Sequence, residues 1–199
     1  MKGLMKASTK ITLSVIGCIG LLLIIGIWFT FYRGLPSVRE IREVEPTRLS
    51  RVLAADGSEI GCYPPEGQIT LAESAIPEFA KQAFIAAEDS SFYDHQGLDY
   101  KRIVGALIVD LRKGSFEQGA STITQQVVRT YLLSSEKTVS RKIREAFLAR
   151  RIERNLTKDQ ILTLYLNRVY LGSGAYGVEA AALRYFGKSC RDLGLAEIA

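Results

Sequence analysis

The longest apolar stretch of the chain lies near its N-terminus, at residues 11–32, and contains no charged residue. As a helix, these 22 residues would extend about 33 Å, enough to cross a hydrocarbon core of about 30 Å. Aromatic side chains gather at the C-terminal end of the stretch, and no small-residue cleavage site follows it. The pattern predicts an uncleaved transmembrane anchor at 11–32, preceded by a cytoplasmic tail at 1–10 that contains three lysines and no acid.

After the anchor, residues 33–50 form a polar connector with both signs of charge. Residues 51–61 read as two short strands around Asp56-Gly57, a dipeptide typical of β-hairpin turns. From Ile76 onward, apolar residues recur at helical spacing. This period predicts helices over 76–88, 100–112, 121–133, 138–155, 158–170 and 177–186. Thr157 and Gln160 have the spacing of a capping box at the start of the helix at 158–170. The body is therefore predicted to be mainly α, with a small β element near the membrane.

The composition is that of a packed globule, because 47% of the 199 residues are hydrophobic and 24% are charged. The net charge is +5, and three of the lysines precede the anchor, so the body is nearly balanced in charge. That balance argues against a nucleic-acid-binding protein. Three cysteines, Cys18, Cys62 and Cys190, without a C-x-x-C pair argue against a disulfide framework or a zinc cluster. We expect three unpaired thiols, with a Cys62–Cys190 disulfide as the alternative.

Two short motifs match functional patterns without the context that these patterns need. Residues 172–177, GSGAYG, fit the glycine pattern of dinucleotide-binding loops, but a predicted helix precedes them and no βαβ unit surrounds them. Ser134 and Lys137 have the spacing of a serine acylation motif, but the S-x-N and K-T-G partners of that motif do not occur in the chain. We expect neither motif to be functional.

A charged residue interrupts the apolar face of the helix predicted at 138–155. Glu145 falls in the middle of the apolar stripe, and Arg141 lies one turn earlier on the same face. A charge in such a stripe costs free energy unless it is paired. One explanation is a surface i,i+4 salt bridge, which contributes little to stability. The other is a functional carboxylate, held in a partly dry cleft and balanced by Arg141.

Two adjacent carboxylates, Glu88 and Asp89, end the helix that starts near Ile76. We expect Glu88 to be sheltered by apolar neighbours at the helix C-terminus, which is a suitable place for an acid–base catalyst. The alternative is an acid exposed to water. The only histidine, His95, follows shortly afterwards. It could serve as a ligand or a base, but a lone histidine is more often a structural hydrogen-bonding group.

Between these acidic positions lies QGASTITQQVVR, residues 118–129, a segment rich in hydroxyl and amide groups. Ser121 can cap a helix here, which accounts for one residue of the segment. A helix start that exposes backbone N–H groups, with Arg129 nearby, suits an anionic phosphate ligand. Residues 137–158 add eight Lys and Arg against two acids. This run indicates either a pyrophosphate site or a face in contact with solvent or anionic lipid.

Four segments, in this order, resemble the signature motifs of the peptidoglycan glycosyltransferases, glycosyltransferase family 51. The first is EDSSFYDHQG at 88–97, and the second is QGASTITQQ at 118–126. The third is RKIRE at 141–145, and the fourth is KDQILTLYLNRVYLG at 158–172. The resemblance covers about residues 51–199 and implies a mainly α, lysozyme-like glycosyltransferase domain behind a transmembrane anchor.

The resemblance implies an inverting enzyme that polymerises lipid II into glycan strands. Glu88 would be the general base that takes the proton from the 4-hydroxyl of the acceptor, while undecaprenyl pyrophosphate leaves the growing chain. Glu145 would be the second catalytic residue. Residues in and beside the four motifs would bind the substrates: Asp89, Phe92, His95, Ser121, Thr122, Thr124, Gln125, Gln126, Arg129, Arg141, Lys142 and Asn167. Many members of the family have Lys where this chain has Arg129.

The sequence requires no cofactor, although Mg²⁺ or Mn²⁺ helps some members of the family. The expected partners are lipid II, the growing glycan chain, the membrane and other proteins of cell-wall synthesis, on the outer side of a bacterial cytoplasmic membrane. Because the family's domain normally continues past Ala199, we expect 51–199 to be C-terminally incomplete, in a monofunctional enzyme or the front of a class A penicillin-binding protein. Two alternatives stay open: an inactive fragment that binds lipid II or a partner, and a lysozyme-like glycan hydrolase.

Overall fold

The computed structural model describes residues 15–22, 25–26, 29, 35–37, 50–63, 69–113, 119, 121–133 and 138–198. Residues 15–22 and 25–26 are helical. Within the described ranges, no helix is long and apolar enough to cross a membrane. Part of the stretch at 11–32 lies outside these ranges, so the anchor stays a prediction.

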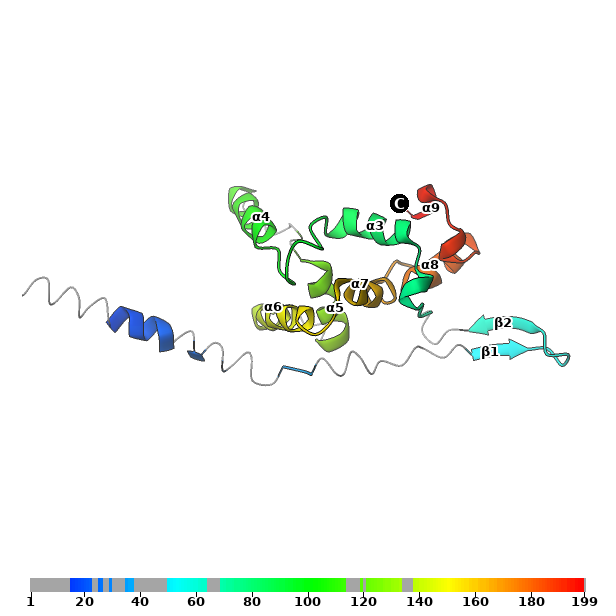
Figure 1. The fold of residues 1–199 in the computed structure, drawn as a ribbon, viewed down its shortest axis with the longest axis horizontal. Coiled ribbons are helices and arrows are strands. Elements are labelled where there is room, and N and C mark those ends of the chain that lie inside the picture. Colours follow the sequence, from blue (N-terminus) through cyan, green and yellow to red (C-terminus); the bar gives the residue numbers. More distant parts are fainter. Residues whose placement is uncertain are drawn as a thin grey trace, which may run out of the picture.

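The predicted hairpin is present at the start of the body. Strands β1 (Ser50–Leu53) and β2 (Glu59–Tyr63) pair antiparallel. At their turn, the backbone N–H and the hydroxyl of Ser58 donate hydrogen bonds to Asp56 Oδ1, at 2.9 and 2.6 Å. Gly57 has a φ of +84°, which glycine adopts without strain. The hairpin (cyan) extends away from the helical body in Figure 1.

The body is mainly helical, as predicted. Its α-helices are α3 (Glu78–Glu88), α4 (Tyr100–Lys113), α5 (Ile123–Leu132), α6 (Val139–Glu153), α7 (Lys158–Leu166), α8 (Val178–Phe186) and α9 (Leu195–Ile198). Two short 3-10 helices, η2 (Glu73–Ala75) and η3 (Cys190–Asp192), and α9 were not predicted. Helix α7 ends earlier than predicted, because the chain leaves the helix at Asn167 and turns toward the loop at 172–177.

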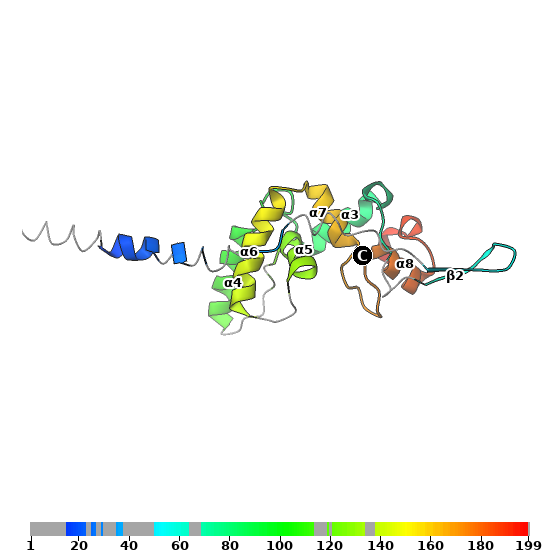
Figure 2. The ribbon, with the colours of Figure 1, turned by 90° about the horizontal axis from the view of Figure 1, so that it is seen from below.

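Helices α5, α6 and α7 form the centre of the body, with α5 packed against both of the others. All three helices contribute inaccessible apolar side chains, which are Ile123, Val127, Val128, Leu148, Ala149, Ile152, Ile161, Leu162 and Leu166. In Figures 1 and 2, α4 lies at one end of this centre and α8 lies toward the other. Helix α4 leaves Ile103, Val104 and Ile108 exposed. Of the two candidate catalytic acids, Glu145 lies on this core, whereas Glu88 is the last residue of α3.

Side chains at the helix starts fix where the central helices begin. The capping box predicted at 157–160 is present at the start of α7. Helix α5 has a capping box too, in which Thr122 accepts from the N–H of Gln125 and the Gln125 side chain accepts from the N–H of Thr122. The prediction that Ser121 caps this helix is therefore wrong by one residue. The hydroxyl of Ser121 instead accepts from Lys142, at 2.7 Å.

Candidate active site

The two acids at the end of α3 lie in opposite environments. Helix α3 ends at Glu88, and the backbone of Asp89 leaves helical geometry. Asp89 is fully buried, whereas Glu88 is exposed. The expectation that apolar neighbours shelter Glu88 is therefore wrong. The reason is that α3 packs against the core one turn earlier, through Phe84, and the chain then turns inward at the second acid.

Asp89 is a junction between four segments. Its Oδ1 accepts from Nη1 of Arg102 on α4 at 3.0 Å. Its Oδ2 accepts from Nε2 of His95 at 2.9 Å and from the backbone N–H of Ile123 at 3.0 Å. Since Ile123 is the first residue of α5, the Asp89 carboxylate is the anion at the positive end of that helix. A fully buried carboxylate requires such partners.

His95 and Phe92 hold the turn that follows Asp89. The N–H of Gly97 donates to Nδ1 of His95 at 3.1 Å, so Nε2 carries the proton that is donated to Asp89. Phe92 is inaccessible, and its ring lies edge-on to that of His95, with the centroids 6.1 Å apart. The ammonium of Lys158 lies 4.5 Å from the centroid of the Phe92 ring. Both predicted site residues therefore make contacts within the fold.

The second candidate acid, Glu145, is fully buried on α6 and paired with two cations. Its Oε2 accepts from Nη1 of Arg141 at 3.0 Å, which confirms that these two residues share one face. Its Oε1 accepts from Nζ of Lys142 and from Nε2 of Gln125, the latter at 3.1 Å. Each carboxylate oxygen therefore has at least one donor, and Glu145 fixes the positions of both cations.

Two consecutive amides of α5 connect the helix to both candidate acids. Gln125 is buried and donates to Glu145. Gln126 is half-buried and donates from Nε2 to Oε2 of Glu88, at 3.0 Å. Within the described part of the chain, Oε1 of Glu88 accepts no hydrogen bond. Glu88 is thus held through one oxygen and accessible through the other, whereas Glu145 is enclosed.

Most polar groups at the start of α5 have hydrogen-bond partners within the protein. The N–H of Thr122 belongs to the capping box, and the N–H of Ile123 donates to Asp89. The hydroxyl of Thr122 donates to a backbone carbonyl at 2.7 Å, and that of Thr124 donates to Oε1 of Glu153 at 2.6 Å. The N–H groups of Thr122 and Ile123 are therefore bonded rather than exposed, because the Gln125 side chain and the Asp89 carboxylate accept from them.

The other two predicted site residues, Asn167 and Arg129, make different contacts. The side chain of Asn167 accepts from the N–H of Leu71 at 2.8 Å and donates to its carbonyl at 2.9 Å. It thereby clamps the segment before η2 onto the end of α7. Arg129 is exposed on α5 and lines a cavity of about 260 Å³ together with Gln126 and Arg168. Arg129 therefore lies on the side of α5 that faces Glu88.

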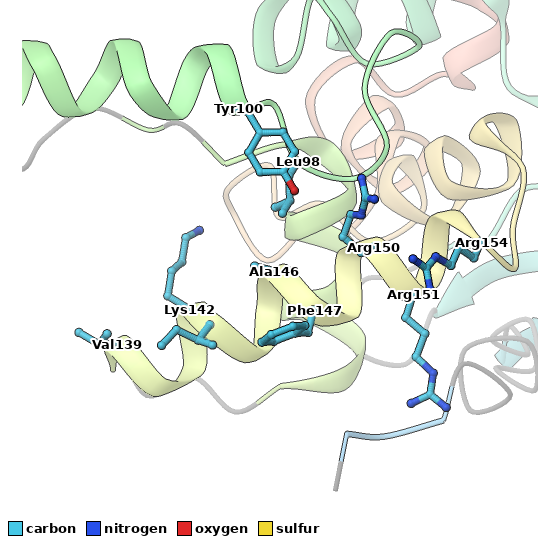
Figure 3. A pocket seen from close by; sticks show the side chains of 10 residues that line it. Leu98, Tyr100, Val139, Lys142, Ala146, Phe147, Arg150, Arg151 and Arg154 are labelled. Atoms are coloured by element: carbon cyan, nitrogen blue, oxygen red, sulfur yellow. The ribbon is translucent and has the colours of Figure 1, made fainter. Parts of the chain in front are cut away.

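A groove of about 670 Å³ runs along α6 beside Leu98 and Tyr100. Figure 3 shows Lys142 toward one end of the groove and the three arginines toward the other. The residues of α6 that line it are Val139, Lys142, Ile143, Ala146, Phe147, Arg150 and Arg151, with Arg154 just beyond the helix. No acid is among the described residues that line the groove. The groove therefore combines apolar walls with cations, and Lys142 connects it to Glu145.

Sequence reasoning missed Arg102 in the first turn of α4. Its Nη1 donates to the backbone carbonyl of Glu88 and to Oδ1 of Asp89, both at 3.0 Å. Asp89 and Arg102 are separated by a turn, so their distance along the sequence matches neither the i,i+4 spacing of a helix nor the alternation of a strand. The amphipathic pattern of 100–112 predicted the helix and carried no signal for this contact.

The described acids fit a protein-held metal ion poorly. Within the described residues, no group of three or more His, Cys, Asp and Glu side chains could hold a metal ion. The two buried acids, Asp89 and Glu145, already accept hydrogen bonds from cations.

Comparison with known proteins places this site in a family. The profile of the Transglycosylase family matches residues 57–199. Penicillin-binding protein 1A of Escherichia coli K12 is 49% identical over 165 residues, which are 83% of this chain and 19% of the relative. Penicillin-binding protein 1A of Neisseria lactamica is 46% identical over 168 residues, 84% of this chain and 21% of the relative.

A third relative, penicillin-binding protein 1A of Vibrio cholerae, is 44% identical over 181 residues, which are 91% of this chain and 22% of the relative. The chain therefore spans about a fifth of the length of the curated relatives it matches. The family profile covers the central helices and both candidate acids. On this agreement, the chain belongs to the Transglycosylase family.

Proposed function

We propose that this chain carries a peptidoglycan glycosyltransferase site, which polymerises lipid II into glycan strands and releases undecaprenyl pyrophosphate. The main observation behind this proposal is the contrast between the two acids that accept hydrogen bonds from α5. Glu88 is exposed and has one oxygen held by Gln126, whereas Glu145 is buried and paired with Arg141 and Lys142. This contrast supports a division of roles, in which Glu88 meets the substrate and Glu145 organises cations.

In this proposal, Glu88 is the general base. Its free oxygen accepts the proton of the 4-hydroxyl of the acceptor lipid II, and the oxygen of that hydroxyl forms the new bond to the anomeric carbon of the growing chain. The bond from that carbon to pyrophosphate breaks on the opposite face, so the configuration inverts. An exposed side chain suits this role, because the base must come within hydrogen-bond distance of a large, incoming substrate.

The cations beside Glu145 provide the electrostatic part of the mechanism. As pyrophosphate leaves, negative charge develops on its oxygens, and positive groups fixed in advance stabilise that charge. Lys142 is held by Glu145 and by Ser121, and it lines the groove in which Arg150 also lies. The apolar walls of the same groove suit the lipid part of the donor. Arg141 and the arginines of the groove would complete the site for pyrophosphate.

A glycan hydrolase would use the acids differently. An inverting hydrolase needs a second carboxylate to activate a water molecule. Glu145 is buried, and both of its oxygens accept from cations or an amide, which disfavours that role. We therefore favour the transferase, in which one carboxylate acts as base and cations stabilise the leaving group. No step requires a metal, although Mg²⁺ or Mn²⁺ could bind the pyrophosphate of the substrate.

The setting of this site is part of the proposal. Residues 11–32 would anchor the chain in a bacterial cytoplasmic membrane by a single pass, with the glycosyltransferase domain at 51–199 on the outer side. The domain would share the helical arrangement of lysozyme. Its partners would be lipid II, the growing glycan and other proteins of cell-wall synthesis. The uncharged stretch at 11–32, the four motifs and the family membership support these statements.

The decisive experiment replaces Glu88 by Gln in the full-length protein and measures polymerisation of labelled lipid II. We expect Glu88→Gln to lose activity by about 10²- to 10⁴-fold, since the amide cannot accept the proton, while the unfolding temperature stays unchanged. Glu78→Gln is the matched control, because Glu78 is an exposed acid on the same helix. Near-normal polymer yield in Glu88→Gln would refute the assignment. Shortening of finished glycan strands by the wild-type protein would favour the hydrolase instead.

A further inference from the structure

We propose that Arg102 is a positioning residue for Glu88, an inference that rests on the proposed role of Glu88 as base. The exposed carboxylate of Glu88 has one described hydrogen bond, from Gln126. A hydrogen bond to one carboxylate oxygen fixes the position of the other oxygen only if the backbone that carries the side chain is fixed as well. The geometry assigns that task to the guanidinium of Arg102, which reaches the backbone of Glu88 from another helix.

Arg102 holds the end of α3 in two ways. Its Nη1 donates to the carbonyl of Glu88 at 3.0 Å. This carbonyl is one of the last four of α3, which have no partner within the helix, and a cation is favourable at that position. The same Nη1 donates to Oδ1 of the neighbouring Asp89, also at 3.0 Å. One nitrogen therefore fixes both the carbonyl of Glu88 and the next residue of the chain.

The second amino group of Arg102 extends the contact to the segment before α5. Its Nη2 lies 3.5 Å from the carbonyl oxygen of Gly119, close to the start of the helix that carries Gln126. Gln126 in turn donates to the carboxylate of Glu88. The backbone of Glu88 is thus held from α4, by Arg102, and its side chain is held from α5, by Gln126. Arg102 also contacts the segment that leads into α5, so it links both attachments.

The starting point of the Arg102 side chain is itself rigid. Asp99 caps α4, because its Oδ1 accepts from the backbone N–H of Arg102 at 3.0 Å. The hydroxyl of Ser91 donates to the other oxygen of Asp99. Ser91 lies two residues after Asp89, so both ends of the Asp89–Arg102 contact belong to one hydrogen-bonded turn. A site held in this way is preorganised, because little motion is left to remove when the substrate binds.

The test compares Arg102→Lys with Lys101→Met in the full-length protein. Lysine keeps a cation beside the buried Asp89, but its side chain ends one bond short of Nη1 and lacks the planar fork. We expect kcat for lipid II polymerisation to fall about 30- to 100-fold, with KM within about threefold, since a misplacement of about 1 Å costs on that order. Arg102→Met should lose more. Lys101 is an exposed cation on the same turn, and Lys101→Met should keep normal kcat.

Hydrogen exchange gives a second readout that needs no enzyme activity. The N–H of Asp89 donates to the carbonyl of Ile85 at the end of α3, at 2.9 Å, and the N–H of Phe92 donates to the carbonyl of Asp89 in the turn, at 2.8 Å. In Arg102→Lys, their exchange should accelerate about tenfold relative to Lys101→Met, because the turn opens more easily. If Arg102→Met does not fold, the Lys variant decides alone.

Three outcomes would be informative in different ways. A kcat for Arg102→Lys within about threefold of that for Lys101→Met would overturn the inference while leaving the proposed function intact. A loss expressed only in KM would also overturn it, because Arg102 would then act on substrate binding. A wild-type protein that forms no polymer would overturn the proposed function, and unchanged exchange in Arg102→Lys would then remove the positioning role as well.

Discussion

Replacing Asp89 by alanine removes the common acceptor of three donors that come from different parts of the chain. These donors are Nη1 of Arg102, Nε2 of His95 and the backbone N–H of Ile123, all within 3.0 Å. The side chain of Arg102 is 31% exposed, so water can replace part of its lost partner. The other two donors are buried, so water replaces their lost acceptor less easily. Asp89→Ala is therefore expected to act on stability before it acts on catalysis.

The size of the effect follows from these contacts. Breaking a buried ion pair by removing one partner costs about 3–5 kcal/mol. The separate hydrogen-bond losses are not simply additive, so about 4 kcal/mol is a reasonable expectation for Asp89→Ala. A domain of this size has about 5–15 kcal/mol of stability in total. The loss would lower the unfolding temperature by roughly 10 °C. Asp89→Asn keeps one acceptor oxygen and should lose less.

Thermal and urea unfolding of the full-length protein in detergent, followed by circular dichroism, would measure this loss. Asp94→Ala is the matched control, because Asp94 is an exposed acid on the same turn, and its replacement should change stability by less than about 0.5 kcal/mol. If Asp89→Ala lowers the free energy of unfolding by less than about 1 kcal/mol, the hydrogen bonds of Asp89 contribute little to stability. The account of this turn as a rigid support for Glu88 would then fail.

Two further predictions concern Gly97 and Cys190. A Cβ on Gly97 would lie 2.8 Å from the carbonyl oxygen of Ala149, and its φ is +86°, so Gly97→Ala should destabilise the fold by about 2 kcal/mol or more. Gly105→Ala, with open space around it in α4, should be neutral or stabilising in the same unfolding assay. Burial raises the pKa of the Cys190 thiol to about 12, so the reactive thiolate is scarce at pH 8. With the other cysteines replaced by serine, alkylation should be slow in the folded protein and fast in urea, and equal rates would contradict this.

The helical body could be predicted because its signals are local. Apolar periodicity located the helices, and the capping box at 157–160 marked the start of α7 correctly. The pairing of Arg141 with Glu145 was also predictable, because residues four apart on a helix share a face. The same spacing argument correctly placed Glu145 on the buried side, next to the core of α6.

The arrangement around Glu88 could not be predicted, because it depends on contacts between distant segments. Nothing in an adjacent pair of acids says which one turns inward, and the structure buries Asp89 rather than Glu88. Asp89 is buried because it accepts hydrogen bonds from Arg102 and from the N–H of Ile123. Both donors come later in the chain than α3, so the local sequence does not reveal them. The N–H group of Ile123 at the start of α5 is bonded rather than exposed for the same reason, since Asp89 reaches that helix end from another part of the chain.

Gln125 and Gln126 contact the two acids from neighbouring positions of one helix, so both contacts depend on how that helix is rotated about its axis. Since neighbouring helical residues are turned by about 100°, one amide reaches inward to Glu145 while the next reaches outward to Glu88. An inserted or deleted residue between the cap of α5 and this pair would swing both amides away from their acids at once. Natural variation in this stretch should therefore tolerate changes of side chain more readily than changes of length.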